Sequence, residues 1–258
     1  AERLPVTTEL FLAEHEVAGA PLVVFVHGSM DRSGAFARCC GHLRDLHTVR
    51  YDRRGYARSV GLGAPALAGH ADDLLEILDE RPAVVIGHSL GGVIALAVAQ
   101  RRPDLMHAVG AYEAPMPWVE WWPKMSAGGD AMNAAADTTA EAAGEVAERF
   151  MRRMISDERW EGLPEATKRT RRAEGPALLA ELRSARSEAP FDPAKITVPV
   201  VVGYSTLSRD HHQWSARELA RVLGADEPFV IEGAGHNAHT THHAEFATFV
   251  RQAVAAAH

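Results

Sequence analysis

Cysteine and long apolar runs are scarce in this chain of 258 residues. The two cysteines, Cys39 and Cys40, are adjacent, and neighbouring cysteines rarely bridge because a disulfide needs a specific Cα separation. The sequence therefore has neither a disulfide framework nor a cysteine-based zinc pattern. No stretch of about 18 apolar residues occurs, so we expect no membrane span. The unbridged cysteines and the lack of a secretory signal pattern favour a cytoplasmic location.

Positive charge is also in short supply. Lys and Arg total 27 against 34 Asp and Glu, which gives a net charge of −7. Nucleic-acid binding needs a basic surface for the phosphates, so we expect no nucleic-acid partner. Basic clusters such as residues 168–172 lie among acidic residues and are typical of solvated helix faces. Apolar residues make up 47% of the chain, which is enough to form a folded core.

Short apolar runs alternate with helical patterns along most of the chain. Continuous runs rich in β-branched residues predict buried strands, and helical periodicity predicts the helices between them. We expect strands at 22–26, 48–51, 83–86, 105–112, 198–202 and 229–231, and helices at 33–46, 71–78, 90–100, 214–223 and 244–256. This alternation predicts an α/β fold with a mostly parallel central sheet and helices on both faces.

Residues 115–190 interrupt the alternation. They begin with a cluster of Pro and Trp and continue as Ala-, Glu- and Arg-rich helical sequence without a convincing strand. The segment lies between two expected sheet strands, so we predict a helical cap inserted into a core formed by 1–114 and 191–258. Insertions over the carboxyl ends of parallel strands commonly shape a ligand crevice.

The segment Gly-His-Ser-Leu-Gly-Gly at residues 87–92 carries the clearest chemical signal. It fits the pattern Gly-x-Ser-x-Gly between a strand and a buried helix, which is the context that the pattern needs. A strand that turns into a helix within one residue forces Ser89 into a strained conformation, and flanking glycines leave room for the turn. The hydroxyl then stands clear of the sheet above the positive end of the helix. Ser89 is a candidate nucleophile; the alternative is that it only caps the helix.

With this segment the chain resembles the α/β-hydrolase family over nearly its whole length. The resemblance rests on His27-Gly28, Asp52–Ser59, the turn at Ser89 and Gly233–His236. Residue 57 is Ala where the family commonly has Gly, in a segment that forms a structural turn in the family. The resemblance implies the α/β-hydrolase fold and a serine hydrolase.

A serine hydroxyl is a weak nucleophile until a base takes its proton. His236 follows a Gly-Ala-Gly loop where α/β-hydrolases keep their histidine, and the chain order of serine, acid and histidine also fits. His239 and His243 lie four residues apart and could chelate zinc, but no Glu completes a zinc motif, so we expect no metal. The turn at Ser89 lacks dinucleotide or phosphate-binding spacing, so no cofactor is implied.

The oxyanion of an acyl-transfer intermediate needs two positioned donors. The geometry of the turn predicts the backbone N–H of Leu90 as one donor. The resemblance implies the N–H of Ser29 as the other, with Met30 as the fallback.

Two carboxylates compete to orient the histidine. In most of the family the acid follows the later strand, typically three residues past a glycine, but that offset from Gly203 gives Thr206. Asp210 lies four residues further on, where Ser208 and Asp210 are also typical of a helix N-terminus. In some relatives, including haloalkane dehalogenases and certain esterases, the acid ends the earlier strand, where Glu113 lies. We favour Glu113 and keep Asp210 as the alternative.

These residues predict a serine hydrolase that cleaves a carboxylic ester or a related acyl compound through an acyl-enzyme. The same constellation supports lactonase, thioesterase, amidase, carbon–carbon hydrolase and perhydrolase chemistry. A serine at position 89 argues against dehalogenases and epoxide hydrolases, which in this family use a carboxylate nucleophile. A small-ligand receptor with little or no turnover is the second class of function. The expected partner is a small acyl substrate, and three residues either line its pocket or pack the cap: Trp118, Trp121 and Trp122.

Overall fold

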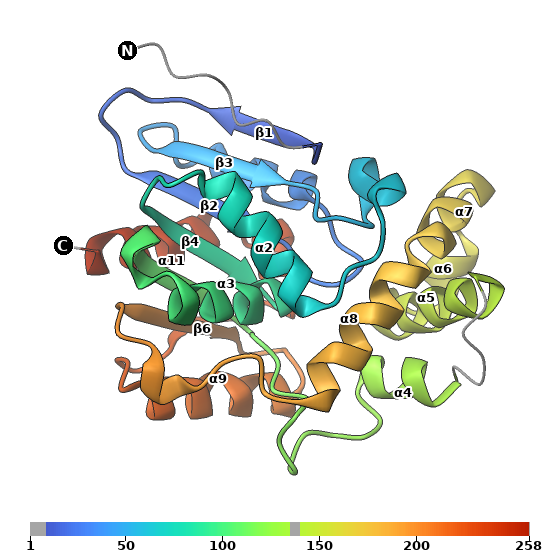
Figure 1. Cartoon of the computed structure of the whole chain (residues 1–258). Coiled ribbons are helices and arrows are strands. Elements are labelled where there is room, and N and C mark those ends of the chain that lie inside the picture. The colour runs from blue at the N-terminus through green and yellow to red at the C-terminus, as the bar shows by residue number, and fades with distance from the viewer. Residues whose placement is uncertain (1–8, 135–139, 258) are drawn as a thin grey trace.

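A seven-stranded sheet forms the centre of the computed structural model, which describes residues 9–134 and 140–257 (Figure 1). The strands are β1 (Leu12–His15), β2 (Leu22–Val26), β3 (His47–Tyr51), β4 (Ala83–His88), β5 (Met106–Tyr112), β6 (Val200–Ser205) and β7 (Phe229–Ile231). They lie in the order β1-β3-β2-β4-β5-β6-β7. Strand β1 runs antiparallel to β3, and the other neighbouring pairs are parallel. The mostly parallel sheet expected from the sequence is therefore confirmed.

Helices cover both faces of the sheet (Figure 1). One face packs against α2 (Leu67–Leu78), α3 (Leu90–Arg101) and α9 (Asp210–Leu223). The other packs against α1 (Ala37–Cys40) and α11 (His243–Ala256). Side chains of β2 alternate between these two cores, which explains why its sequence is a continuous apolar run. Among the described residues, no helix is long and apolar enough to cross a bilayer.

Some elements differ from the prediction. The helix expected at 33–46 is a 3₁₀ turn (Ser33–Phe36) followed by the single turn of α1, which ends at Gly41. Strand β6 begins at Val200 rather than at residue 198, directly after Pro199, which has no N–H to donate to a ladder. Helix α9 begins at Asp210, four residues before the predicted start.

The chain between β5 and β6 contains α4 (Ala127–Ala134), α5 (Ala140–Ile155), α6 (Asp157–Glu161), α7 (Glu165–Ala173) and α8 (Gly175–Ser187). Figure 1 shows these helices gathered on the side of the sheet toward which β3 points. They share a hydrophobic cluster of their own, centred on the fully buried Trp160. Tyr56 from the loop after β3 joins this cluster, so the inserted helices pack directly on the sheet domain.

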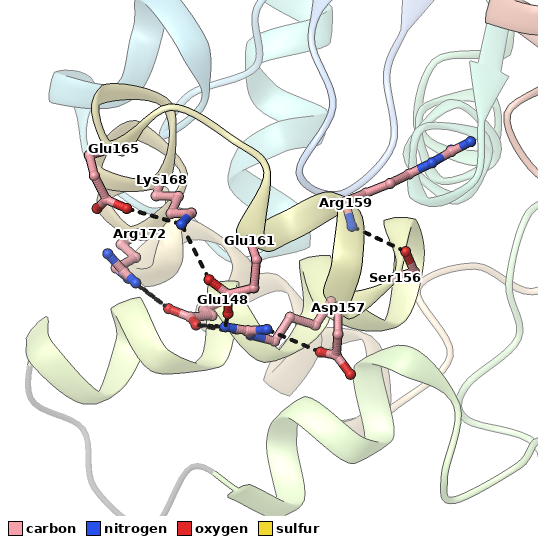
Figure 2. Close-up of polar contacts among 9 residues, drawn as sticks. Glu148, Ser156, Asp157, Arg159, Glu161, Glu165, Lys168 and Arg172 are labelled. Carbon is pink, nitrogen blue, oxygen red and sulfur yellow. Dashed lines mark hydrogen bonds and ion pairs between the residues drawn. The ribbon is translucent and has the colours of Figure 1, made fainter.

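Several basic side chains of these helices are paired with acidic side chains. Glu148 on α5 accepts hydrogen bonds from Arg152, at 2.8 Å, and from Arg172 on α7, also at 2.8 Å (Figure 2). Lys168 contacts Glu165 at 3.0 Å and Glu161 at 3.4 Å (Figure 2). Such ion pairs at the surface contribute little to stability, because solvent screens them. They neutralise the positive charge of this surface.

A buried ion pair joins α8 to the loop after β3. The side chains of Arg53 and Glu181 are fully buried, with Nη1 and Oε2 2.9 Å apart. The same guanidinium donates to the carbonyl oxygens of His27 at 2.9 Å and Gly28 at 3.0 Å. Tyr56 donates its hydroxyl to the other oxygen of Glu181 at 2.6 Å. One inserted helix is thus fixed to the loop that follows β2.

Candidate active site

Ser89 makes the turn between β4 and α3 alone. Its backbone angles are φ 52° and ψ −126°, a strained conformation for a residue with a side chain. The conformation is held because the N–H of Ser89 donates to the Tyr112 carbonyl at 2.8 Å and the N–H of Gly92 donates to the Ser89 carbonyl at 2.9 Å. The strained turn expected from the sequence is present.

Two glycines are required by close backbone contacts at this turn. A Cβ on Gly87 would lie 2.3 Å from the carbonyl oxygen of Gly91. A Cβ on Gly91 would lie 2.1 Å from the carbonyl oxygen of Val26, on the neighbouring strand. Neither distance is compatible with a real side chain, so the tight turn depends on both glycines.

Glu113 and His236 meet at the carboxyl end of the sheet. Nδ1 of His236 lies 2.5 Å from Oε2 of Glu113, whose side chain is fully buried. Glu113 directly follows β5 and has a positive φ of 47°, which turns it out of the strand. Its other oxygen accepts the backbone N–H of Ser205 at 2.7 Å and the hydroxyl of Ser208 at 2.6 Å. Three donors therefore fix the carboxylate.

The same contacts set the charge on Glu113. Burial alone would raise the pKa of its carboxyl, but the hydrogen bond and charge of His236, with the donors from Ser208 and Ser205, bring the pKa below its usual value. An ionised carboxylate can only accept hydrogen bonds. Nδ1 of His236 is therefore the donor in this hydrogen bond, and Nε2 is the ring nitrogen that does not contact Glu113.

Asp210, the alternative acid, is the first residue of α9 and has an exposed side chain. Arg209, rather than Ser208, is the residue that directly precedes the helix, and the hydroxyl of Ser208 donates to Glu113. The structure brings Glu113, rather than Asp210, into contact with His236.

A cavity of about 100 Å³ brings together most of the residues that the sequence singles out. Its lining includes Ser29, Ser89, Leu90, Trp122 and His236. Much of the remaining wall is apolar and comes partly from the inserted helices, through Phe150, Met154, Leu182 and Ala185. The candidate nucleophile, the candidate base and the two candidate oxyanion donors thus line one small, mostly apolar cavity.

Three predicted residues lie elsewhere. Met30 is buried in the cluster of the inserted helices, and its carbonyl accepts from Arg171 at 2.9 Å. Trp118 packs against Phe191, with ring centroids 5.7 Å apart. Trp121 is 40% exposed. Of the three tryptophans, Trp122 is the one in the cavity lining.

Further histidines surround His236, and the sequence reasoning missed them. His212 stacks on His236 with ring centroids 4.3 Å apart, and Nε2–H of His88 donates to the carbonyl oxygen of His236 at 2.8 Å. Burial lowers the pKa of His212 and His88 well below the usual value, and lowers that of His211 to about 4. These rings are neutral near pH 7. The adjacent histidines 211 and 212, just after a sheet strand, could have indicated that these rings lie near the site. The chain has 14 histidines, however, so this pair did not stand out in the sequence.

His239 and His243 do not form the zinc-binding pair considered above. His239 lies on α10 (Ala238–Thr241) and contacts Asp31 at 2.9 Å, whereas His243 begins α11 and contacts His42 at 2.8 Å. Two other groups offer possible metal ligands within 4.8 Å of one another: Asp31, His88 and His239, and Glu113, His212 and His236. In both groups a carboxylate already contacts an imidazole directly.

A model of the Alpha/beta hydrolase family matches residues 23–249. The chain belongs to this family. Among solved structures, the α/β-hydrolase fold of this chain is similar to that of a thermophilic esterase from Thermogutta terrifontis, with a TM-score of 0.74 and 20% identity over 100% of both chains. It is also similar to the enol-lactonase from Burkholderia xenovorans LB400, with a TM-score of 0.72 and 21% identity, covering 95% of this chain and 96% of that one.

Sequence relatives of this α/β hydrolase match over a shorter stretch. The uncharacterized hydrolase YraK of Bacillus subtilis is 34% identical over 107 residues, which are 38% of this chain and 40% of that protein. Lipase LipV of Mycobacterium tuberculosis is 28% identical over 104 residues, 39% of this chain and 40% of its own. The matches thus span about two fifths of the length of these relatives.

Proposed function

We propose that this protein is a serine hydrolase that cleaves a carboxylic ester or a related acyl compound, with Ser89 as nucleophile, His236 as base and Glu113 as the orienting acid. The observation that carries the proposal is the 2.5 Å contact between His236 Nδ1 and Glu113 Oε2, beside a cavity that His236 and Ser89 both line. Family membership and relatives named as an esterase, a lipase and an enol-lactonase agree with it.

The proposed reaction begins with proton transfer. Nε2 of His236 takes the proton of the Ser89 hydroxyl as its oxygen attacks the acyl carbon. The carboxylate of Glu113 stabilises the imidazolium that forms. The oxyanion accepts hydrogen bonds from the backbone N–H groups of Ser29 and Leu90, at the positive N-terminal end of α3. His236 then protonates the leaving group, and a water molecule, activated by the same base, releases the acid.

We infer that helices α4–α8 act as a cap over this site. They contribute Phe150, Met154 and Leu182 to the cavity wall, and so they limit the size and polarity of the acyl group. Exclusion of water by this wall would strengthen the hydrogen bonds to the oxyanion. The cytoplasmic location predicted from the sequence stays a prediction.

The test compares the wild type with Ser89→Ala on p-nitrophenyl esters of increasing acyl length. We expect turnover by the wild type and a loss of at least about 10³-fold in the variant, because the nucleophile is gone. A fluorophosphonate probe should label the wild type, and peptide mass spectrometry should locate the label on Ser89. Saturable binding of acyl ligands without turnover or labelling would favour the receptor function instead.

A further inference from the structure

Arg186, in the last turn of α8, lines the cavity and has no acidic partner in the part of the chain that the structure describes. Among residues 9–134 and 140–257, its one hydrogen bond is from Nη2 to the Ser126 hydroxyl oxygen at 3.3 Å, and its buried Nε has no partner. Several other arginines of the insertion do contact a carboxylate; Arg149, for example, contacts Asp130 at 2.9 Å. Arg186 is therefore a cation held at the substrate cavity with donor capacity to spare.

Ser126 is a second donor at the same place. Its oxygen accepts from Trp122 Nε1 at 3.2 Å, from the N–H of Gly129 at 3.2 Å and from Arg186 at 3.3 Å. These contacts occupy its acceptor capacity, and its own O–H is given to no acceptor within the described part of the chain. Ser126 as a whole residue is 7% exposed and lines the cavity. An incoming anion would meet both the guanidinium and this hydroxyl.

The surroundings of Arg186 favour an anion. Burial is what lowers the pKa of its guanidinium, which nevertheless stays protonated at neutral pH. The carboxylate of Asp31 also lines the cavity, but it contacts His239 at 2.9 Å. A partly buried cation without a counter-ion is costly, and a bound carboxylate would offset that cost.

We propose that Arg186 and Ser126 bind a free carboxylate carried by the substrate, so that the preferred substrates are acyl compounds with a second, ionised carboxyl group. Monoesters of dicarboxylic acids are the simplest members of this class. The planar guanidinium matches a carboxylate, and the small cavity suits a short chain between that carboxylate and the reacting carbonyl. This inference rests on the proposed function for its reaction, although the binding step can be measured separately.

The kinetic test uses monoethyl esters of succinic, glutaric, adipic and pimelic acids. Each is paired with the ester in which a neutral carboxamide replaces the carboxylate, and hydrolysis is followed by proton release. We expect kcat/KM for the best carboxylate to exceed that of its amide about 10- to 100-fold, as one charge-assisted hydrogen bond would give. Arg186→Met should remove this preference, mainly through KM, and Arg186→Lys should keep part of it. Arg183→Met, an exposed position on α8, is the matched control and should keep it all.

The binding test separates this inference from the proposed function. Ser89→Ala is titrated calorimetrically with the four dicarboxylates and their diamides. We expect the dicarboxylates alone to bind, with binding lost when Arg186→Met is added and kept when Arg183→Met is added. Melting followed by circular dichroism verifies that each variant is folded.

The outcomes are distinct. Carboxylate and amide esters hydrolysed equally well, with no dicarboxylate binding, would overturn the inference and leave the proposed function standing. Dicarboxylate binding that depends on Arg186, without hydrolysis of any ester, would support the inference and overturn the proposed function.

Discussion

Replacing Glu113 with Gln tests the proposed acid through its hydrogen bonds. The backbone N–H of Ser205 can only donate, so the amide oxygen of Glu113→Gln must take the place of Oε1. The amide NH₂ then takes the place of Oε2, 2.5 Å from His236 Nδ1. Because NH₂ can only donate, Nδ1 must become the acceptor and the ring proton moves to Nε2. A protonated Nε2 cannot take the proton of Ser89.

The magnitude follows from this change of tautomer. A histidine held in the wrong tautomer costs about 10⁴-fold in kcat, which corresponds to about 5 kcal/mol in the barrier. The assay is hydrolysis of p-nitrophenyl butyrate at pH 7.5, with urea unfolding as the check on folding. Asp210→Asn is the matched control, because its carboxylate is exposed, and we expect it to stay within about threefold of the wild type. If Asp210→Asn removed activity while Glu113→Gln kept most of it, the reasoning would be refuted.

Two further predictions concern stability, and urea unfolding measures both. Gly91→Ala should lower the free energy of unfolding by about 3 kcal/mol or more, or prevent folding, because its Cβ would meet the Val26 carbonyl at 2.1 Å. Gly61→Ala, which has nothing within 4 Å of the new Cβ, should change it by less than about 0.5 kcal/mol; equal effects would contradict the packing argument. Burial lowers the pKa of His27 to about 3 and that of His211 to about 4. Between these values and the usual pKa of about 6.5, the two histidines are protonated in the unfolded chain and neutral in the folded chain. Stability should therefore fall with pH below about 6.5, by at least about 2 kcal/mol between pH 7 and pH 5, whereas a flat profile would show that these rings are not buried as described.

The sheet could be predicted where strands are buried on both faces. β2, which is buried along its whole length, has the bounds expected from its apolar run, and the short edge strand β7 has its expected bounds as well. β1 escaped notice because it is a four-residue edge strand, half exposed, that pairs with β3. The helix expected at 33–46 has helical periodicity, but its residues form separate short turns that end at Gly41.

The site shows where sequence reasoning reaches its limit. Ser89 stood out because its motif is local, but the choice between Glu113 and Asp210 depends on which strands are neighbours. β5 and β6 pair in parallel, so Glu113 lies beside Ser205 and receives its N–H. Ser126 and Arg186 are 60 residues apart and share no motif, so only the packing of the inserted helices shows that they meet.

The buried pair of Arg53 and Glu181 has a consequence for substrate entry. Swinging α8 outward would carry Glu181 away and leave the buried guanidinium of Arg53 without its counter-ion, at a cost of about 3–5 kcal/mol. Fewer than about one molecule in a hundred would then be open at any moment. We therefore expect most ligands to arrive and depart while α8 stays docked, through movement of smaller parts of the wall.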